Sequence, residues 1–219
     1  MFKTVIFDLD GTLLNTLEDL ALASNLVCQA RGWPTHDLDA FKYFVGNGRP
    51  KLVERFTPPQ CRTPEILAQV TREFNDTYAA HKEDNTAPYP GIPALLAKLK
   101  AAGIATGVVS NKDDGPTKAV VAHYLPGLVT AARGRVDGVP EKPHPAGVLA
   151  LMEELGADPS TTLYVGDSDV DIFTAKNSGL PGCGVLWGFR TKEELEAAGA
   201  AYLAADAAAL EAIIFGEGL

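Results

Sequence analysis

From about residue 91 onward, the sequence alternates between short apolar runs and longer amphipathic stretches. The apolar runs have the length and the β-branched content of buried strands. The stretches between them show helical periodicity and end at glycines such as Gly103 and Gly156. Alternation of this kind predicts an α/β fold with a doubly wound, Rossmann-like parallel sheet, its strands in the order 3-2-1-4-5. The predicted strands are residues 5–7, 104–109, 128–131, 162–165 and 184–187, with another short one near Tyr202.

Residues 15 to about 86 interrupt this alternation, because they show helical patterns and no strand pattern. Thr63-Pro64-Glu65 is a strong helix start, with proline in the first helical position. Thr16 and Asp19 fit a capping box at the start of the first helix in this stretch. Since the stretch lies between the first and second strands, we predict an α-helical cap domain, residues 15–86, inserted into a catalytic core of residues 1–14 and 87–219.

The first predicted strand ends at two carboxylates. Val5-Ile6-Phe7 is apolar enough to be buried on both faces of a sheet, and Asp8 and Asp10 follow it. Ligands bind at the carboxyl ends of strands in open α/β sheets. Two acids this close can share a divalent cation, or divide the roles of nucleophile and acid/base. In isolation, however, the pair is more simply explained as the opening of a turn.

Three further polar clusters follow other predicted strands. They are Ser110-Asn111-Lys112, Lys142-Pro143 and the run from Gly166 to Asp171. Taken singly, Ser110 is explained as a turn residue, Lys142 as a solvated charge, and the aspartates as helix caps. The carboxyl ends of parallel strands share one edge of a sheet, so we expect these groups to converge. The converging set is Asp8, Asp10, Ser110, Lys142, Asp167 and Asp171.

These residue types suit phosphoryl transfer. A carboxylate can attack phosphorus and form an aspartyl-phosphate, while a second acid protonates the leaving oxygen and later activates water. Hydroxyl, ammonium and backbone N–H groups can bind the phosphoryl oxygens. An anionic nucleophile about 3.5 Å from a phosphate meets a repulsion of roughly 5 kcal/mol per charge pair at an effective dielectric constant of about 20. Mg²⁺, which several carboxylates can bind, would offset this repulsion.

Four motifs together resemble those of the haloacid dehalogenase-like hydrolase superfamily, in order and over essentially the whole chain. They are Asp8-Leu9-Asp10-Gly11-Thr12, Ser110-Asn111-Lys112, Lys142-Pro143-His144-Pro145 and Gly166-Asp167-Ser168-Asp169-Val170-Asp171. The place of the helical insert is similar to that in the type-1 cap subclass. The resemblance implies a Mg²⁺-dependent phosphatase that hydrolyses small phosphate monoesters through an aspartyl-phosphate.

The resemblance implies a role for each acid of the first motif. Asp8 would be the catalytic nucleophile and a Mg²⁺ ligand. Asp10 would be the catalytic general acid/base, with its backbone carbonyl on the metal. Dehalogenases of the superfamily lack the second acid, so Asp10 implies phosphate chemistry.

The other motifs supply binding groups by the same resemblance. Ser110 and the backbone of Asn111 would bind the phosphoryl group. Lys142 would bridge the nucleophile and the phosphate, as a residue that is both catalytic and phosphate-binding. Asp167 would be a metal ligand, and Asp171 would be a ligand or would hold a metal-bound water.

Within the superfamily, Val45-Gly46-Asn47-Gly48 most resembles the phosphoglycolate phosphatases, which makes phosphoglycolate the best single candidate substrate. Pyrophosphate and nucleoside monophosphates are other candidates. Arg49 follows this loop where many of those enzymes have a small residue. We hypothesise that Asn47 and Arg49 belong to a specificity loop of the cap and that Arg49 binds a substrate carboxylate or second phosphate. A solvated surface arginine explains the residue equally well.

Other functions stay open at this point. A sugar phosphomutase of the β-phosphoglucomutase type would use the same two acids but return the phosphoryl group to the sugar. A signalling receiver domain also accepts phosphate on an aspartate, but such domains are shorter and lack the second acid. A binding protein without catalysis is disfavoured, because every chemical position is filled.

The composition constrains the partners. With 19 basic and 28 acidic residues, the chain has a formal net charge of −9, which disfavours general binding to nucleic acid. No apolar stretch is long enough to span a membrane, and we expect no signal peptide. Cys28, Cys61 and Cys183 form no CxxC, so we expect neither disulfides nor zinc in a cytoplasmic protein. We predict a monomer or homodimer whose partner is a small phosphorylated metabolite.

Overall fold

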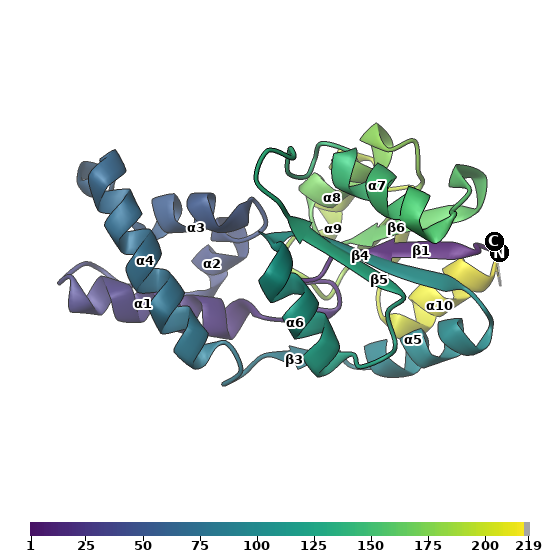
Figure 1. Ribbon diagram of the computed structural model, residues 1–219, viewed down its shortest axis with the longest axis horizontal. Coiled ribbons are helices and arrows are strands. Elements are labelled where there is room, and N and C mark those ends of the chain that lie inside the picture. The colour runs from purple at the N-terminus through teal and green to yellow at the C-terminus, as the bar shows by residue number, and fades with distance from the viewer. Residues whose placement is uncertain (217–219) are drawn as a thin grey trace. The chain divides into compact units, whose positions relative to one another are not determined.

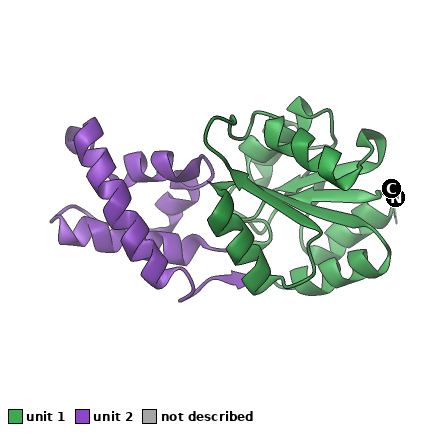
Figure 2. Cartoon of the chain, viewed as in Figure 1, with its two compact units in different colours: residues 1–14, 88–219 green, residues 15–87 purple. Residues whose placement is uncertain are grey.

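The computed structural model describes residues 1–216, which form two compact units (Figure 2). The core unit comprises Met1–Leu14 and the chain from Pro88 onward, and the insert unit comprises Asn15–Ala87. In the described residues, no helix has both the length and the apolar character needed to cross a membrane.

A six-stranded sheet forms the centre of the core unit (Figure 1). Its order is β5-β4-β1-β6-β7-β8, and every neighbouring pair is parallel. In order of appearance along the chain this is 3-2-1-4-5-6, which confirms the predicted doubly wound sheet; the short strand predicted near Tyr202 is β8, at its edge. The strands are β1 (Thr4–Phe7), β4 (Ala105–Asp113), β5 (Ala131–Arg135), β6 (Thr162–Gly166), β7 (Gly182–Val185) and β8 (Tyr202–Ala204).

Helices cover both faces of this sheet, because alternate residues of the strands point to opposite sides. Val5 and Phe7 of β1 pack with α5, α6 and α10, whereas Ile6 packs with α7 and α8 (Figure 1). All three side chains are fully buried, as their uninterrupted apolar run predicts. The helices of this unit are α5 (Ile92–Ala101), α6 (Asp114–Tyr124), α7 (Ala146–Leu155), α8 (Asp169–Asn177), α9 (Lys192–Ala198) and α10 (Ala207–Phe215).

The insert unit is helical and has its own apolar interior. Phe56 and Phe74 are buried with their ring centroids 6.0 Å apart, and Val70 is fully buried beside them along α4. As predicted, α4 begins with proline in its first turn, and the Thr63 side chain caps it by accepting from the N–H of Ile66. The helices are α1 (Leu17–Ala30), α2 (Leu38–Phe44), α3 (Gly48–Phe56) and α4 (Pro64–His81), with a short 3₁₀ turn at Pro59–Cys61. At the boundary of the units, β2 (Leu14–Asn15) and β3 (Ala87–Pro88) pair with each other.

Two predicted strands are displaced along the chain. The third strand is β5 at Ala131–Arg135, because Leu128 and Val129 pack against the core from the preceding turn instead. The fifth is β7 at Gly182–Val185, which begins at glycines that resemble a turn in the sequence. A Cβ on Gly182 would lie 3.1 Å from the Cβ of Ala175, so this glycine allows α8 to pack closely on the sheet.

The predicted capping box at the start of α1 is wrong. Thr16 makes no side-chain cap, and Asp19 is not bonded back to it. The buried Asp19 carboxylate instead accepts from the backbone and the side chain of both Asn85 and Thr86, at 2.7–2.9 Å. These partners lie 66 and 67 residues away in sequence, so a tertiary contact has replaced the local one.

We expect Asp19→Ala to lower the free energy of unfolding by roughly 3 kcal/mol, because it leaves several buried donors without an acceptor. Urea denaturation followed by circular dichroism measures the change. Asp39→Ala is the matched control, since the Asp39 side chain is 85% exposed and its ion pair with Lys42 lies at the surface of the same unit. Equal stability of the two variants would contradict the structural role given to Asp19.

Candidate active site

The three central strands of the core unit bring the motif residues to one edge of the sheet. β1 lies between β4 and β6, and Asp8 follows β1 with its N–H donated to the carbonyl of Val165 at 2.8 Å. Asp167 comes directly after β6, and Asp171 lies in the first turn of α8. The convergence expected from the parallel sheet therefore occurs.

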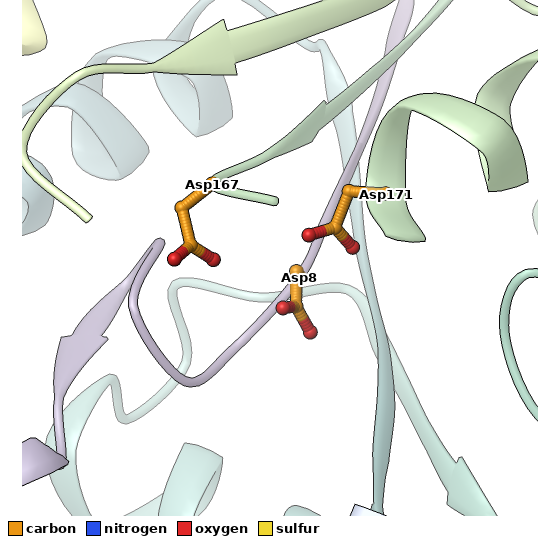
Figure 3. Close-up of side chains that lie close together, drawn as sticks. All are labelled: Asp8, Asp167 and Asp171. Atoms are coloured by element: carbon orange, nitrogen blue, oxygen red, sulfur yellow. The ribbon is translucent and has the colours of Figure 1, made fainter. Parts of the chain in front are cut away.

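Three of the predicted acids form a compact buried cluster. Asp8, Asp167 and Asp171 each offer a carboxylate oxygen within 4.8 Å of the others. Figure 3 shows the three carboxylates gathered around a common space, from the end of β1, the end of β6 and the start of α8. Their exposed fractions are 8%, 1% and 0%, so little water is available to screen their charges.

Lys142 is the cation of this cluster. Its Nζ lies 2.7 Å from Asp8 Oδ1 and 2.7 Å from Asp171 Oδ1, and it donates to the hydroxyl of Tyr164 at 3.3 Å. An ammonium group has three N–H donors, so each has an acceptor. Lys142 is thereby fixed against the nucleophile candidate Asp8.

Asp171 is saturated with hydrogen bonds. Its Oδ1 accepts from Lys142 and from the hydroxyl of Tyr164, and its Oδ2 accepts from the N–H and the hydroxyl of Ser168. A carboxylate offers about four lone-pair positions, and all four are used here. The arrangement makes Asp171 the anchor of Lys142 rather than an open metal ligand.

The cluster carries an excess of negative charge, because one ammonium faces three carboxylates. Burial, followed by the charge of Asp171, raises the pKa of Asp8 above its usual range. The same two causes raise the pKa of Asp167 to about 7. Burial alone lowers the pKa of Lys142, but Asp171 and Asp8 outweigh it and hold that pKa above its usual value. All three shifts have the direction expected where buried carboxylates outnumber the ammonium.

A divalent cation fits this donor set. Asp8 and Asp167 supply carboxylate oxygens, which hard cations such as Mg²⁺ prefer. The hydroxyl of Thr12 and the N–H of Phe189 each donate to one oxygen of Asp167, and this orients its carboxylate. Three carboxylates and one ammonium give the cluster a net charge of about −2 before phosphate enters, which a divalent cation balances.

Ser110 and Asn111, two of the predicted phosphate-binding residues, lie within β4 and not after it as predicted, because this strand continues to Asp113. The Ser110 hydroxyl accepts from the N–H of Lys112 at 3.1 Å. The side chain of Asn111 pairs with the backbone of Lys142, accepting from its N–H at 2.9 Å and donating to its carbonyl at 3.2 Å. Asn111 therefore holds the loop that carries the lysine.

Asp10 contacts a second lysine that the sequence interpretation left without a role. Lys112 Nζ lies 3.4 Å from Asp10 Oδ1, and both side chains are largely buried. Asn47 and Arg49, the other predicted site residues, belong to the insert unit. There Arg49 donates from Nη1 to Asn75 Oδ1 at 2.9 Å.

Two further contributors were missed. Tyr164 lies in the middle of a buried strand, where its ring is indistinguishable from a core residue in the sequence. Ser168 stood inside a recognised motif, and its spacing of three from Asp171 is that of the capping box it forms. The latter pattern could have been found from sequence.

The pKa of Asp167 near 7 predicts that binding of a divalent cation such as Mg²⁺ releases protons in mildly acidic solution, because a metal binds the deprotonated carboxylate. We expect the Kd for Mg²⁺ to be up to about tenfold weaker at pH 6 than at pH 8. Since this folded-state pKa lies above the unfolded value, the metal-free protein loses stability as the pH rises through about 7. Isothermal titration calorimetry at the two pH values measures the binding, and identical affinities would contradict the prediction.

Comparison with known proteins agrees with this site. The family model described as haloacid dehalogenase-like hydrolase matches residues 5–185. A phosphoglycolate phosphatase of Vibrio parahaemolyticus is 32% identical over 92% of this chain and 91% of its own length. An N-acetylmuramic acid 6-phosphate phosphatase of Pseudomonas aeruginosa is also 32% identical, over 88% and 85%.

Solved structures share the whole fold. A protein from Lactobacillus delbrueckii subsp. bulgaricus matches with a TM-score of 0.92 at 31% identity, covering 97% of this chain and 98% of its own. CbbY from Rhodobacter sphaeroides, solved in complex with phosphate, matches with a TM-score of 0.77 at 25% identity over 95% and 96%. The chain therefore belongs to the haloacid dehalogenase-like hydrolases, and among them it is similar to phosphatases that act on phosphate monoesters.

Proposed function

We propose that this protein is a Mg²⁺-dependent phosphatase of small phosphate monoesters that works through an aspartyl-phosphate on Asp8. The observation that carries the proposal is the buried Asp8 carboxylate, held 2.7 Å from Lys142 and beside Asp167 at the edge of the sheet. Asp8, Asp167 and the carbonyl of Asp10 would hold the metal, which neutralises charge on the phosphoryl oxygens when bound.

The residues divide the reaction into two steps. An oxygen of Asp8 attacks phosphorus, the bond to the ester oxygen breaks, and Asp10 gives its proton to the leaving alcohol. Asp10 then takes a proton from water as the water attacks phosphorus, and the Asp8 carboxylate leaves with its electron pair. Ser110, the backbone N–H of Asn111 and Lys142 hold the phosphoryl oxygens in both steps.

Phosphoglycolate is the substrate that we favour. Supporting it are the relatives named phosphoglycolate phosphatase and the resemblance of Val45-Gly46-Asn47-Gly48 to that group. The relative that acts on N-acetylmuramic acid 6-phosphate supports a broader class, since both names denote phosphate esters that carry a carboxylate. A phosphomutase is the second candidate, because the same two acids suit it.

A phosphate-release screen over small phosphorylated metabolites, with Mg²⁺ and with EDTA, tests the proposal. We expect Mg²⁺-dependent release, fastest from phosphoglycolate. Isomerisation of a sugar phosphate without release would favour the mutase, and a long-lived phosphoprotein without turnover would favour a receiver domain. Release that persists in EDTA would contradict the metal requirement.

We further propose that the insert unit acts as the cap and that its loop at Asn47 selects the substrate through Arg49. Arg49→Ala is then expected to raise KM at least about tenfold for a substrate with a carboxylate, because a charged hydrogen bond is lost. KM for a substrate without a second anion should stay within about twofold. Arg72→Ala, at an exposed position of the same unit, is the control. Unchanged selectivity across the panel would remove this role of Arg49.

A further inference from the structure

Two loops of the core unit hold the side chain of Asp167 from different directions. Thr12, in the loop after β1, donates its hydroxyl to Oδ1 at 3.2 Å. Phe189, in the loop after β7, donates its backbone N–H to Oδ2 at 2.8 Å. Both carboxylate oxygens are thus oriented by donors that lie far apart in the sequence.

Gly188 allows the second loop to come this close. A Cβ placed on Gly188 would lie 2.2 Å from the Cβ of Asp167 and 2.6 Å from its Oδ2. Gly188 is not among the glycines with positive φ, so its backbone would accept another residue. Space beside Asp167, rather than backbone conformation, is therefore what demands glycine here.

Trp187 ties the two loops to each other. Its indole Nε1 donates to the carbonyl of Thr12 at 3.0 Å. The chain of contacts runs from Trp187 to Thr12, from Thr12 to Asp167, and from Asp167 back to Phe189. These contacts, closed by the chain between Trp187 and Phe189, fix the Asp167 carboxylate relative to β1, which Asp8 directly follows.

We propose that the Trp187-Gly188-Phe189 segment is a positioning element for Asp167 and that Gly188 is required for Mg²⁺ affinity. The inference rests on the proposed function only through its metal. Mg²⁺ demands near-ideal octahedral geometry with ligand distances of about 2.0–2.1 Å. A methyl group at position 188 would overlap the side chain of Asp167 if neither residue moved. The carboxylate or the loop must therefore shift.

Calorimetric titration of Mg²⁺ into the full-length protein at pH 8 tests the inference. We expect Gly188→Ala to raise the Kd for Mg²⁺ by about 10- to 100-fold. The matched control is Gly115→Ala, because a Cβ at that helical position meets nothing within 4 Å and its φ is ordinary. Gly115→Ala should bind Mg²⁺ like the wild type. Thermal melts in EDTA show whether each variant is folded.

A second variant keeps the test decisive if Gly188→Ala does not fold. Trp187→Phe keeps an aromatic ring and removes the N–H that bonds Thr12, and we expect it to raise the Kd about threefold or more. If Gly188→Ala folds and binds Mg²⁺ with wild-type affinity, the inference is overturned. If Gly188→Ala does not fold, wild-type affinity in Trp187→Phe overturns it. Either result leaves the proposed function standing. A wild-type protein that binds no Mg²⁺ would contradict the metal-dependent function itself.

Discussion

Replacing Asp8 by asparagine is expected to lower kcat for phosphate release by about 10⁴-fold or more, because a carboxamide is a poor nucleophile for phosphorus. The substitution is nearly isosteric and removes one charge from a cluster with excess negative charge. The variant should therefore fold as well as the wild type, or better. The measurement is the initial rate of phosphate release from phosphoglycolate with saturating Mg²⁺.

The control for Asp8→Asn is the same change at Asp137. The Asp137 side chain is 97% exposed and pairs with Arg135 at 3.2 Å in the loop before the lysine motif. We expect its kcat to stay within about twofold of the wild type, as for most surface substitutions. Full Mg²⁺-dependent activity in Asp8→Asn would show that another residue attacks phosphorus.

Replacing Lys142 by methionine is expected to affect both activity and stability. It keeps the buried aliphatic chain but leaves Asp8 and Asp171 facing each other without a cation. Removing one partner from a buried ion pair costs about 3–5 kcal/mol, and losing a donor to the transition state lowers kcat by about 10²- to 10³-fold. Urea denaturation in EDTA and steady-state kinetics measure the two effects.

The stability loss in Lys142→Met should depend on pH. The pKa of Asp8 is already raised, and removing the ammonium raises it further. When the pKa of a carboxyl group is higher in the folded than in the unfolded protein, the free energy of unfolding falls as the pH rises through the folded-state pKa. The loss should therefore be larger at pH 8 than at pH 5, and Mg²⁺ should recover part of it.

Lys118→Met provides the comparison, because Lys118 is an exposed partner of Asp114 on the surface of α6. Its effect should be below about 0.5 kcal/mol at both pH values. If Lys142→Met loses the same free energy of unfolding at pH 5 and at pH 8, the ammonium does not offset the negative charge of the carboxylates.

The parts of the fold that the sequence predicts well are those with a strong local pattern. The apolar run at residues 5–7 fits only a strand that is buried on both faces of the sheet. The order of the strands follows from their alternation with helices. The strand β5 was misplaced because it lies at the edge of the sheet, where each of its residues is only partly buried. An edge strand needs little apolar content, so periodicity does not mark it.

The candidate site shows the same limit. Asp8, Lys142 and Asp167 were found because each follows a strand that parallel topology brings to one edge. The hydroxyl of Tyr164 was not, because a tyrosine in a buried strand has the same sequence pattern whether or not it meets a lysine. Backbone donors such as the N–H of Phe189 carry no residue identity at all.

Asp19 shows how a correct local rule can give a wrong result. Threonine followed three residues later by an acid is a frequent helix start, but Asn85 and Thr86 offer this acid four stronger donors. No spacing rule relates residues that far apart. Only the folded insert unit brings them together.

The pairing of β2 with β3 has a consequence for how enzymes of this design can diversify. The chain leaves the core unit and returns to it on two adjacent strands, so the whole segment Asn15–Ala87 has the topology of a single long loop. Exchange of that segment between relatives leaves the order and register of the six-stranded sheet untouched. With the roles that we propose for the two units, substrate choice and bond-breaking chemistry can then be inherited separately, the insert being exchanged while the core unit is kept.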